Sequence, residues 1–108
     1  MKYLTVVRHA KSSWDHPGLA DHDRPLNSRG QRAAPAVATF LHKTYFGGAE
    51  STEPLLPLPD RLISSTAARA LATAQVFRET LGLDIESLNL DSRLYLAADS
   101  TILKIVQD

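Results

Sequence analysis

Three short apolar runs along the chain have the length and composition of β-strands. They comprise residues 3–7, 62–64 and 86–90. Runs this short favour strands over helices, particularly where β-branched side chains are present. The first run, Tyr3-Leu4-Thr5-Val6-Val7, ends abruptly at Arg8. We therefore expect a buried strand that reaches the surface at that residue.

A helical pattern follows the polar loop after the first run. Asn27 or Ser28 can accept a hydrogen bond from a free amide at the start of a helix, and apolar residues then recur at helical spacing. These apolar positions are Ala33, Ala34, Val37, Ala38 and Leu41. Pro35 interrupts the pattern, because a proline inside a helix removes a backbone hydrogen bond and crowds the preceding turn. We expect a helix with one buried face that is kinked or restarted at Pro35.

Two further helices are expected later in the chain. The residues that would cap or stop them are Ser65 or Thr66 and Gly82 for the second helix, and Asp99 or Ser100 for the third. The second helix would run through Leu81. The third would have one apolar face, formed by Ile102, Leu103, Ile105 and Val106. Residues 47–59 are rich in glycine and proline and show no periodicity, so we expect an exposed connector there.

Strands that alternate with helices predict an α/β fold. In such a chain each helix leads from one strand to a parallel neighbour, which gives βαβ units with right-handed crossovers. The chain has 108 residues, enough for one domain with a modest core. We therefore expect a single domain over residues 1–108 with a mainly parallel sheet.

The amino-acid composition excludes several classes of binding partner and chemistry. Twelve acidic residues balance twelve basic ones, which argues against general attraction to nucleic acid or to an anionic membrane. The chain contains no cysteine, and this excludes disulfides, thiol catalysis and cysteine-based zinc sites. The apolar run before Arg8 is too short for a signal-peptide core or a membrane span, so a cytoplasmic location is expected.

The end of the first strand carries the most distinctive candidate chemistry. Arg8 and His9 stand where the strand should surface, and ligands of open α/β sheets bind beyond the carboxyl ends of the strands. The arginine fork can donate paired hydrogen bonds to phosphoryl oxygens, while a neutral imidazole can attack phosphorus. The alternative is an ordinary surface dipeptide. Only additional phosphate-binding residues elsewhere in the sequence would favour the catalytic interpretation over a surface dipeptide.

Two more arginines supply that support. Arg24 lies in the segment Asp23-Arg24-Pro25-Leu26, and Arg69 falls in the first turn of the second helix. The amino-terminal end of a helix favours anions, because its free amides and its dipole present positive charge. Arg24 has an alternative role, since it could cover apolar surface or pair with Asp21 or Asp23.

Together these segments resemble the histidine phosphatase superfamily, which includes phosphoglycerate mutases and acid phosphatases, and most closely its SixA-type phosphohistidine phosphatase branch. Arg8-His9-Ala10 matches the Arg-His-Gly signature, and the segment from Ser64 to Ala74 is similar to the second phosphate-binding segment. The resemblance implies a three-layer sandwich around a mainly parallel sheet and catalysis without a metal or another cofactor. It also implies that His9 is the nucleophile, assisted by Arg8 and Arg69, and that Arg8, Arg24 and Arg69 bind phosphate.

One catalytic element of the superfamily has no counterpart in this sequence. The second catalytic histidine normally follows a further strand in a Gly-His context, and no such motif occurs after Leu90. The chain therefore resembles the amino-terminal part of a longer phosphatase, incomplete at its carboxyl end. The remaining histidines are His16, His22 and His42. None lies in the expected motif, and solvent exposure is the simpler interpretation of each.

The proton donor is also left open by the sequence. Candidates are Asp15, Asp21, Asp23 and Asp91. Mutases of the superfamily place an acidic residue near the third strand, where this chain has Arg93-Leu94-Tyr95. A phosphorylated histidine has a good leaving group and needs less help from an acid, which is compatible with a phosphohistidine phosphatase.

Three hypotheses about function follow. The first is a phosphatase that acts on phosphohistidine in a protein partner through a phosphohistidine intermediate on His9. The second keeps this enzyme class but takes a small phosphomonoester, as a small-molecule phosphatase or a mutase-like enzyme would. The third is a phosphate-binding fragment that lacks useful turnover. Neither nucleic acid nor membrane is an expected partner, and the oligomeric state is left open.

Overall fold

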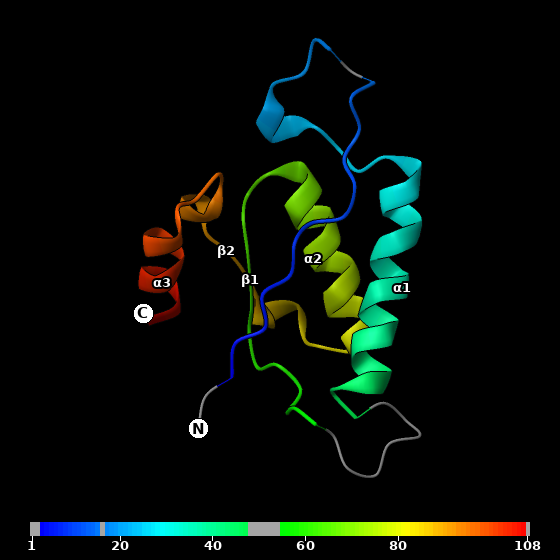
Figure 1. Cartoon of the computed structure of the whole chain (residues 1–108), viewed down its shortest axis with the longest axis vertical. Coiled ribbons are helices and arrows are strands. Elements are labelled where there is room, and N and C mark those ends of the chain that lie inside the picture. Colours follow the sequence, from blue (N-terminus) through cyan, green and yellow to red (C-terminus); the bar gives the residue numbers. More distant parts are fainter. Residues whose placement is uncertain (1–2, 16, 48–54, 108) are drawn as a thin grey trace.

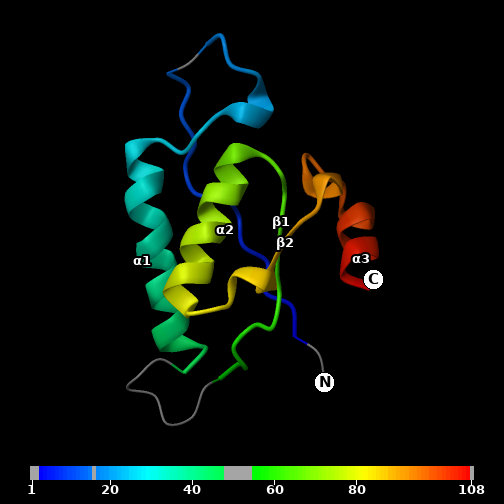
Figure 2. The same cartoon turned by 180° about the vertical axis from the view of Figure 1, so that it is seen from behind.

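The computed structural model describes residues 3–15, 17–47 and 55–107 and has an α/β fold (Figure 1). Its helices and strands are α1 (Ser28–Thr44), β1 (Leu62–Ser64), α2 (Ala68–Leu81), β2 (Leu88–Leu90) and α3 (Asp99–Gln107). Helices α1 and α2 lie on one side of the two strands and α3 lies on the other, as the opposite views show (Figures 1 and 2). This arrangement confirms the predicted fold class.

The sheet consists of β1 and β2, which pair in parallel with Leu62 opposite Leu88. Helix α2 connects the two strands, so β1, α2 and β2 form a βαβ unit. The predicted strand at residues 62–64 is confirmed. The strand expected at residues 86–90 begins later, at Leu88, because Ile85–Ser87 forms a single 3-10 turn. That turn is closed by the Ser87 amide, which donates to the Asp84 carbonyl at 3.0 Å.

The first predicted strand is not part of this sheet. Residues 3–7 run past the sheet as extended chain, and within the described part of the protein they pair with neither strand. Their side chains are exposed, 62% for Leu4 and 75% for Val6. The expectation of a buried strand is therefore wrong. A β-branched run favours extended backbone, but a strand needs a neighbour that completes its hydrogen-bonded ladder and covers its faces.

Helix α1 begins where the capping residues predict. The Asn27 side chain accepts a hydrogen bond from the Gly30 amide at 2.8 Å, which satisfies one free donor of the first turn. The helix then continues through Pro35, so the structure shows no restart there. Pro35 is exposed, so water can reach the carbonyl that loses its amide partner. The buried face carries Ala34 and Ala38, whose small side chains allow close packing against α2.

This cap gives a testable prediction for stability. Asn27→Ala should lower the free energy of unfolding by about 1 kcal/mol, because the Gly30 amide loses its partner. The measurement is urea unfolding followed by circular dichroism. Ser28→Ala is the matched control, since Ser28 is the exposed first residue of the same helix. Equal losses in the two variants would contradict the assignment of Asn27 as the cap.

Helix α2 starts later than the sequence suggests. Ala67 is the residue before its first turn, and neither Ser65 nor Thr66 caps it; the Ser65 hydroxyl instead accepts from the Ala67 amide at 3.2 Å. The stop at Gly82 is confirmed. Gly82 has φ of 70°, a left-handed conformation that favours glycine and ends the helix.

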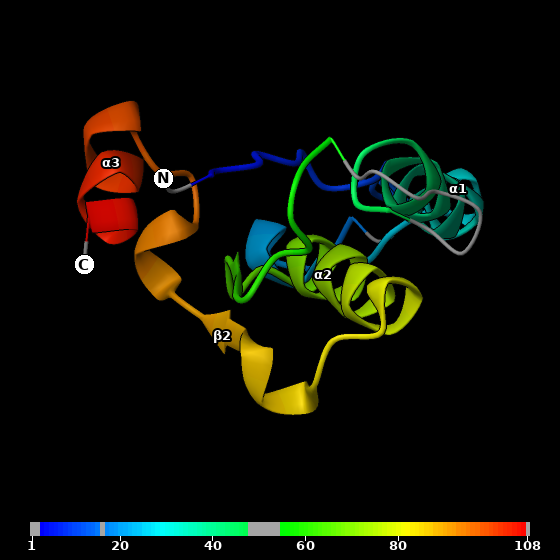
Figure 3. The same ribbon diagram turned by 90° about the horizontal axis from the view of Figure 1, so that it is seen from below.

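The main core lies between α1, α2 and β1. Its buried members are Ala38, Phe46, Phe77 and Leu81, and the half-buried residues packed against them are Leu41, Leu56, Leu62 and Leu83. Helix α3 stands apart from α1 and α2, with β2 between them (Figure 3). Only Ile105 of its expected apolar face is buried, while Leu103 and Val106 are exposed. The small core therefore rests mainly on the packing of α1 against α2.

The connector after α1 is only partly described. Residues 48–54 of the predicted connector lie outside the described residues. The described remainder forms neither helix nor strand, and Leu56 donates its amide to the Tyr45 carbonyl at 2.8 Å. Among the described helices, none combines the length and the hydropathy needed to cross a membrane.

Candidate active site

A closed loop brings Arg24 back to the end of the first extended segment. Residues 11–13 and 25–27 pair in antiparallel fashion, with Ser12 opposite Leu26. The Ser13 amide donates to the Pro25 carbonyl at 2.8 Å, and this contact helps close the loop that contains Arg24. The sequence predicted a surface loop here, and its closure places Arg24 beside Ser12 and Ser13, a few residues after His9.

The Arg24 guanidinium is buried and fully oriented by this loop. Its Nε donates to the Ser13 carbonyl at 3.0 Å, and Nη2 donates to the Ser12 hydroxyl. Nη1 donates to Asp21 Oδ1 at 2.8 Å. The exposed Trp14 ring covers the guanidinium, with 3.4 Å between the Arg24 Cζ and the ring centroid. Asp21 is one of the two partners that the sequence offered for Arg24.

Arg69 reaches the same carboxylate from helix α2. It lies in the first turn of the helix, as predicted, where it is the second residue, and its side chain is buried. Its Nη1 donates to the Asp21 backbone carbonyl at 2.6 Å, and its Nη2 donates to Asp21 Oδ2 at 3.0 Å. Two arginines that are far apart in sequence therefore meet at one residue of the loop.

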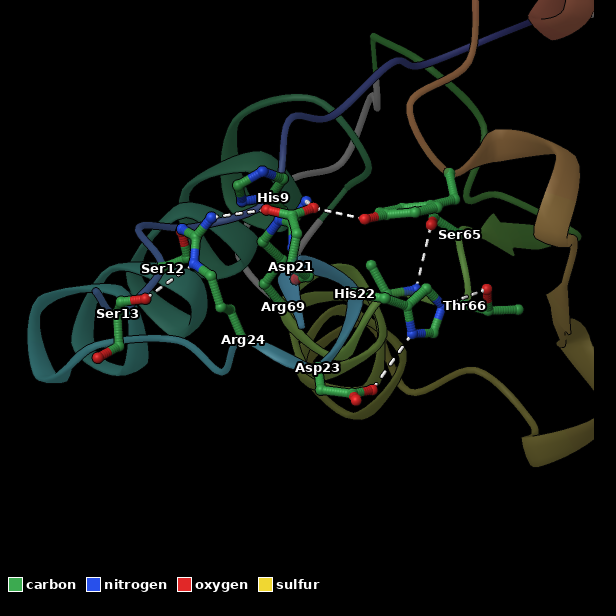
Figure 4. A network of polar contacts seen from close by, with 12 residues as sticks. His9, Ser12, Ser13, Asp21, His22, Asp23, Arg24, Ser65, Thr66 and Arg69 are labelled. Carbon is green, nitrogen blue, oxygen red and sulfur yellow. Dashed lines mark hydrogen bonds and ion pairs between the residues drawn. The ribbon is translucent and has the colours of Figure 1, made fainter. Parts of the chain in front are cut away.

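Asp21 is the centre of this polar network (Figure 4). Besides the two arginines, the Tyr95 hydroxyl donates to Asp21 Oδ2 at 2.5 Å. The Tyr95 hydrogen bond, followed by the Arg69 hydrogen bond, lowers the pKa of Asp21 to about 2. The same contact with Asp21 raises the pKa of Tyr95. Near neutral pH Asp21 therefore carries a proton even more rarely than an ordinary carboxyl group, which weakens its candidacy as the general acid.

Asp91 is weakened as a proton donor in the same way. The Arg93 side chain donates to both carboxylate oxygens, from Nε to Asp91 Oδ1 at 3.0 Å and from Nη2 to Asp91 Oδ2 at 2.7 Å. These hydrogen bonds lower the pKa of Asp91. The remaining two candidates, Asp15 and Asp23, are exposed.

The lowered pKa of Asp21 predicts a loss of stability in acid. An aspartate whose pKa is lower in the folded state stabilises the fold above the unfolded pKa, and this contribution disappears as pH falls through the folded pKa. For Asp21 the window runs from 3.8 down to about 2. Thermal midpoints of the wild type and Asp21→Asn should differ at neutral pH and converge across this window. A difference that stays constant with pH would contradict the ionised contact.

His9 is held in one tautomer by its neighbour. Its Nδ1 lies 2.7 Å from the Ala10 carbonyl, and a carbonyl can only accept, so Nδ1 carries the proton in the neutral ring. The lone pair of Nε2 is then available as a nucleophile. The Ala10 amide donates to the Thr73 hydroxyl at 3.1 Å, and that hydroxyl donates to the Arg69 carbonyl at 2.9 Å. This chain of contacts links the His9 segment to the first turns of α2.

The structure brings together only some of the four residues to which the resemblance assigns catalysis or phosphate binding: Arg24 and Arg69 meet at Asp21, whereas Arg8 and His9 line a separate hollow. In Figure 4 no dashed line joins His9 to Arg24 or to Arg69. Arg8 is exposed, and within the described ranges it forms no hydrogen bond or ion pair with those three. Together with His9 it lines a hollow of about 180 Å³ between α1 and α2, which neither Arg24 nor Arg69 lines. Within the described ranges residues 3–8 pair with no strand, and an unpaired segment does not fix the direction of the Arg8 side chain.

The other histidines differ in their surroundings. His22 was expected to face solvent, but its Nε2 lies 2.8 Å from the Thr66 hydroxyl and its ring packs edge-on against Tyr95 at 4.9 Å. It therefore ties the loop to the start of α2. His42 is half-buried near the end of α1. His16 lies outside the described residues.

Sequence reasoning missed the central role of the Asp21 and Tyr95 pair. The spacing of Asp21 and Arg24 within one turn was a usable signal for their ion pair. Nothing local connects Asp21 with Tyr95, which is 74 residues away. Only the fold brings the turn after β2 against the first loop.

Comparison with known proteins defines the class to which this fold and site belong. The profile of the Histidine phosphatase superfamily (branch 1) matches residues 4–94. The match includes His9 and all three candidate arginines. The chain belongs to this superfamily, as the motifs suggested.

Solved structures show the same relationship. A candidate phosphohistidine phosphatase SixA from Agrobacterium tumefaciens superposes with a TM-score of 0.72 at 30% identity, over 94% of this chain and 57% of that one. A second candidate phosphohistidine phosphatase SixA, from Nakamurella multipartitia, superposes with a TM-score of 0.64 at 30% identity, over 91% of this chain and 46% of that one.

The curated relatives are named as uncharacterized proteins. An uncharacterized protein of Mycobacterium tuberculosis is 37% identical over 101 residues, which cover 91% of this chain and 51% of the relative. An uncharacterized chloroplastic protein of Arabidopsis thaliana is 39% identical over 70 residues, or 65% of this chain and 27% of the relative. The chain thus spans about half the length of the bacterial relatives and solved structures that it matches.

Proposed function

We propose that the protein is a metal-independent phosphatase in which His9 is the nucleophile. The observation that carries this proposal is the hydrogen bond from His9 Nδ1 to the Ala10 carbonyl, which leaves the Nε2 lone pair free to attack. Nε2 forms a bond to phosphorus while the bond from phosphorus to the leaving group breaks. Water then attacks the phosphohistidine, releases inorganic phosphate and restores the imidazole.

The arginines stabilise the negative charge that phosphoryl transfer places on the equatorial oxygens. Arg24 and Arg69 are buried and oriented, and such preorganised donors cost little reorganisation when charge develops. Arg8 is exposed beside His9 and supplies a third cation close to the nucleophile. No part of this scheme requires a metal ion.

Phosphohistidine carried by a protein is the substrate that we favour. The imidazole of phosphohistidine leaves more readily than an alkoxide and demands less from a general acid. The lowered pKa values of Asp21 and Asp91 are compatible with a substrate of this kind. Both SixA neighbours carry the name of such an activity. The partner would be a phosphorylated protein, and a cytoplasmic location stays a prediction.

A second candidate is a phosphate-binding unit without useful turnover. It is favoured by residues 3–7, which are exposed and which, in the part of the chain that the structure describes, pair with no strand just before His9. The two candidates predict different results in one assay. Release of inorganic phosphate from phosphohistidine supports the enzyme, whereas phosphate binding without release supports the second candidate.

Arg8 provides a test of charge stabilisation. Arg8→Ala should slow phosphate release by roughly 10²-fold or more, because the charge that develops in the transition state loses the cation next to the nucleophile. Initial rates with phosphohistidine and with a phenyl phosphate analogue measure this effect. Arg32→Ala is the matched control, because Arg32 is an exposed arginine of α1. Similar rates in both variants would remove Arg8 from the mechanism.

A further inference from the structure

The Asp21 carboxylate lies between the two arginines that the proposed function assigns to phosphate. One oxygen accepts from Arg24 at 2.8 Å, and the other accepts from Arg69 at 3.0 Å. We propose that Asp21 is an internal ligand of this anion site, which an incoming phosphoryl group must displace. The inference rests on the proposed function, because it takes Arg24 and Arg69 as the phosphate-binding residues.

The burial of the three side chains supports the role of Asp21 as a displaceable ligand. The side chains of Arg24 and Arg69 are 9% and 8% exposed, whereas that of Asp21 is 43% exposed. The carboxylate is therefore reached by solvent while it occupies Nη1 of Arg24 and Nη2 of Arg69, whereas the Trp14 ring covers the face of the Arg24 guanidinium. Arginine presents the same planar fork to carboxylates and to phosphates. A phosphoryl group that approaches from solvent would need the hydrogen-bond donors of Arg24 and Arg69 that Asp21 now occupies.

The contacts of Arg24 allow it to stay in place when Asp21 leaves. Its Nε and Nη2 donate to Ser13 and Ser12, which belong to the paired segment at the base of the loop. These two hydrogen bonds orient the guanidinium without help from the carboxylate. Arg24 would therefore keep its position and lose only one partner, which the phosphoryl oxygens would replace.

A rotation of the Asp21 side chain is enough for the exchange. The Asp21 backbone carbonyl accepts separately from Arg69 Nη1 at 2.6 Å, so the loop can remain attached to α2 while the carboxylate turns into solvent. The Tyr95 hydroxyl, which now donates to Asp21 Oδ2, would become available to a phosphoryl oxygen. The site would then offer donors from Arg24, Arg69 and Tyr95.

The net charge of the site predicts how replacing Asp21 changes the affinity for phosphate. Two guanidinium groups and one carboxylate carry a net charge of about +1, and neutralising the carboxylate raises this to about +2. An asparagine at position 21 can still accept one hydrogen bond, but it competes more weakly than a carboxylate for arginine. Asp21→Asn should therefore bind inorganic phosphate about three- to tenfold more tightly than the wild type, a range limited by solvent screening of a half-exposed group.

Calorimetric titration with inorganic phosphate tests this directly. Asp23→Asn is the matched control, because it removes the same charge from the same 3-10 turn, where Asp23 is exposed and its carboxylate lies 3.4 Å from His22 Nδ1. We expect tighter binding in Asp21→Asn and an unchanged dissociation constant in Asp23→Asn. Weaker binding in Asp21→Asn, or the same change in both variants, would overturn the inference.

A second measurement uses the wild-type chain and does not depend on the folding of a variant. Carbon NMR can follow the titration of the Asp21 carboxyl group with and without saturating phosphate. Displacement into solvent should return its pKa from about 2 toward 3.8. A pKa that stays low with phosphate bound would overturn the inference and leave the phosphatase proposal intact. Failure of the wild type to bind phosphate at all would instead contradict both.

Discussion

His9→Ala should reduce the release of phosphate from phosphohistidine by at least about 10⁴-fold, because removal of a nucleophile leaves no route to the covalent intermediate. The fold should survive. His9 is half-buried, and its one described hydrogen bond joins it to the adjacent Ala10. The measurement is the initial rate at saturating substrate, together with a circular dichroism spectrum of the variant.

His42→Ala is the matched control for His9→Ala. His42 is also half-buried, but it lies in the last turn of α1. Its loss should leave the rate near that of the wild type. Retention of wild-type turnover by His9→Ala would contradict the nucleophilic role, whatever the substrate.

Gly30→Ala should produce the largest loss of stability among the substitutions considered. A Cβ at position 30 would lie 2.1 Å from the Lys11 backbone carbonyl oxygen and 2.9 Å from the Lys11 nitrogen. Backbone atoms cannot yield by a change of rotamer, so α1 and residues 11–13 would have to separate. We expect the free energy of unfolding to fall by about 3 kcal/mol or more, which is at the upper end for overpacked sites.

The same substitution should also impair phosphate binding. Residues 11–13 hold Arg24 through Ser12 and Ser13, so a shift of this segment moves the guanidinium. Gly18→Ala is the control, since a Cβ there meets nothing within 4 Å. Urea unfolding and phosphate titration measure the two effects. An unchanged unfolding midpoint in Gly30→Ala would show that the close approach of Lys11 and Gly30 is not present in solution.

Local signals in the sequence account for much of the framework. Asn27 and Gly82 act at helix ends through their own side chain or backbone, so their roles could be predicted without knowledge of the fold. The place of Arg69 in the first turn of α2 could be predicted from the nearby residues that can cap or stop a helix. The start of α2 was harder to predict, because Ser65 uses its hydroxyl within a turn rather than as a cap.

The remaining features depend on contacts between distant segments. The apolar run at residues 3–7 has the composition of a strand, but strand formation also requires a partner, which no local pattern can guarantee. The pairing of Asp21 with Tyr95 joins the first loop to the turn after β2. Both the exposure of the first segment and the carboxylate at the anion site are therefore properties of the whole fold.

Trapping the covalent intermediate tests the central claim most directly. The protein would be mixed with phosphohistidine that carries a radioactive phosphoryl group, quenched rapidly in base, digested and mapped by mass spectrometry. We predict an acid-labile label on the peptide that contains His9 and no such label in His9→Ala. Phosphate release without any labelled His9, or a label on another residue that persists in His9→Ala, would contradict the proposed mechanism.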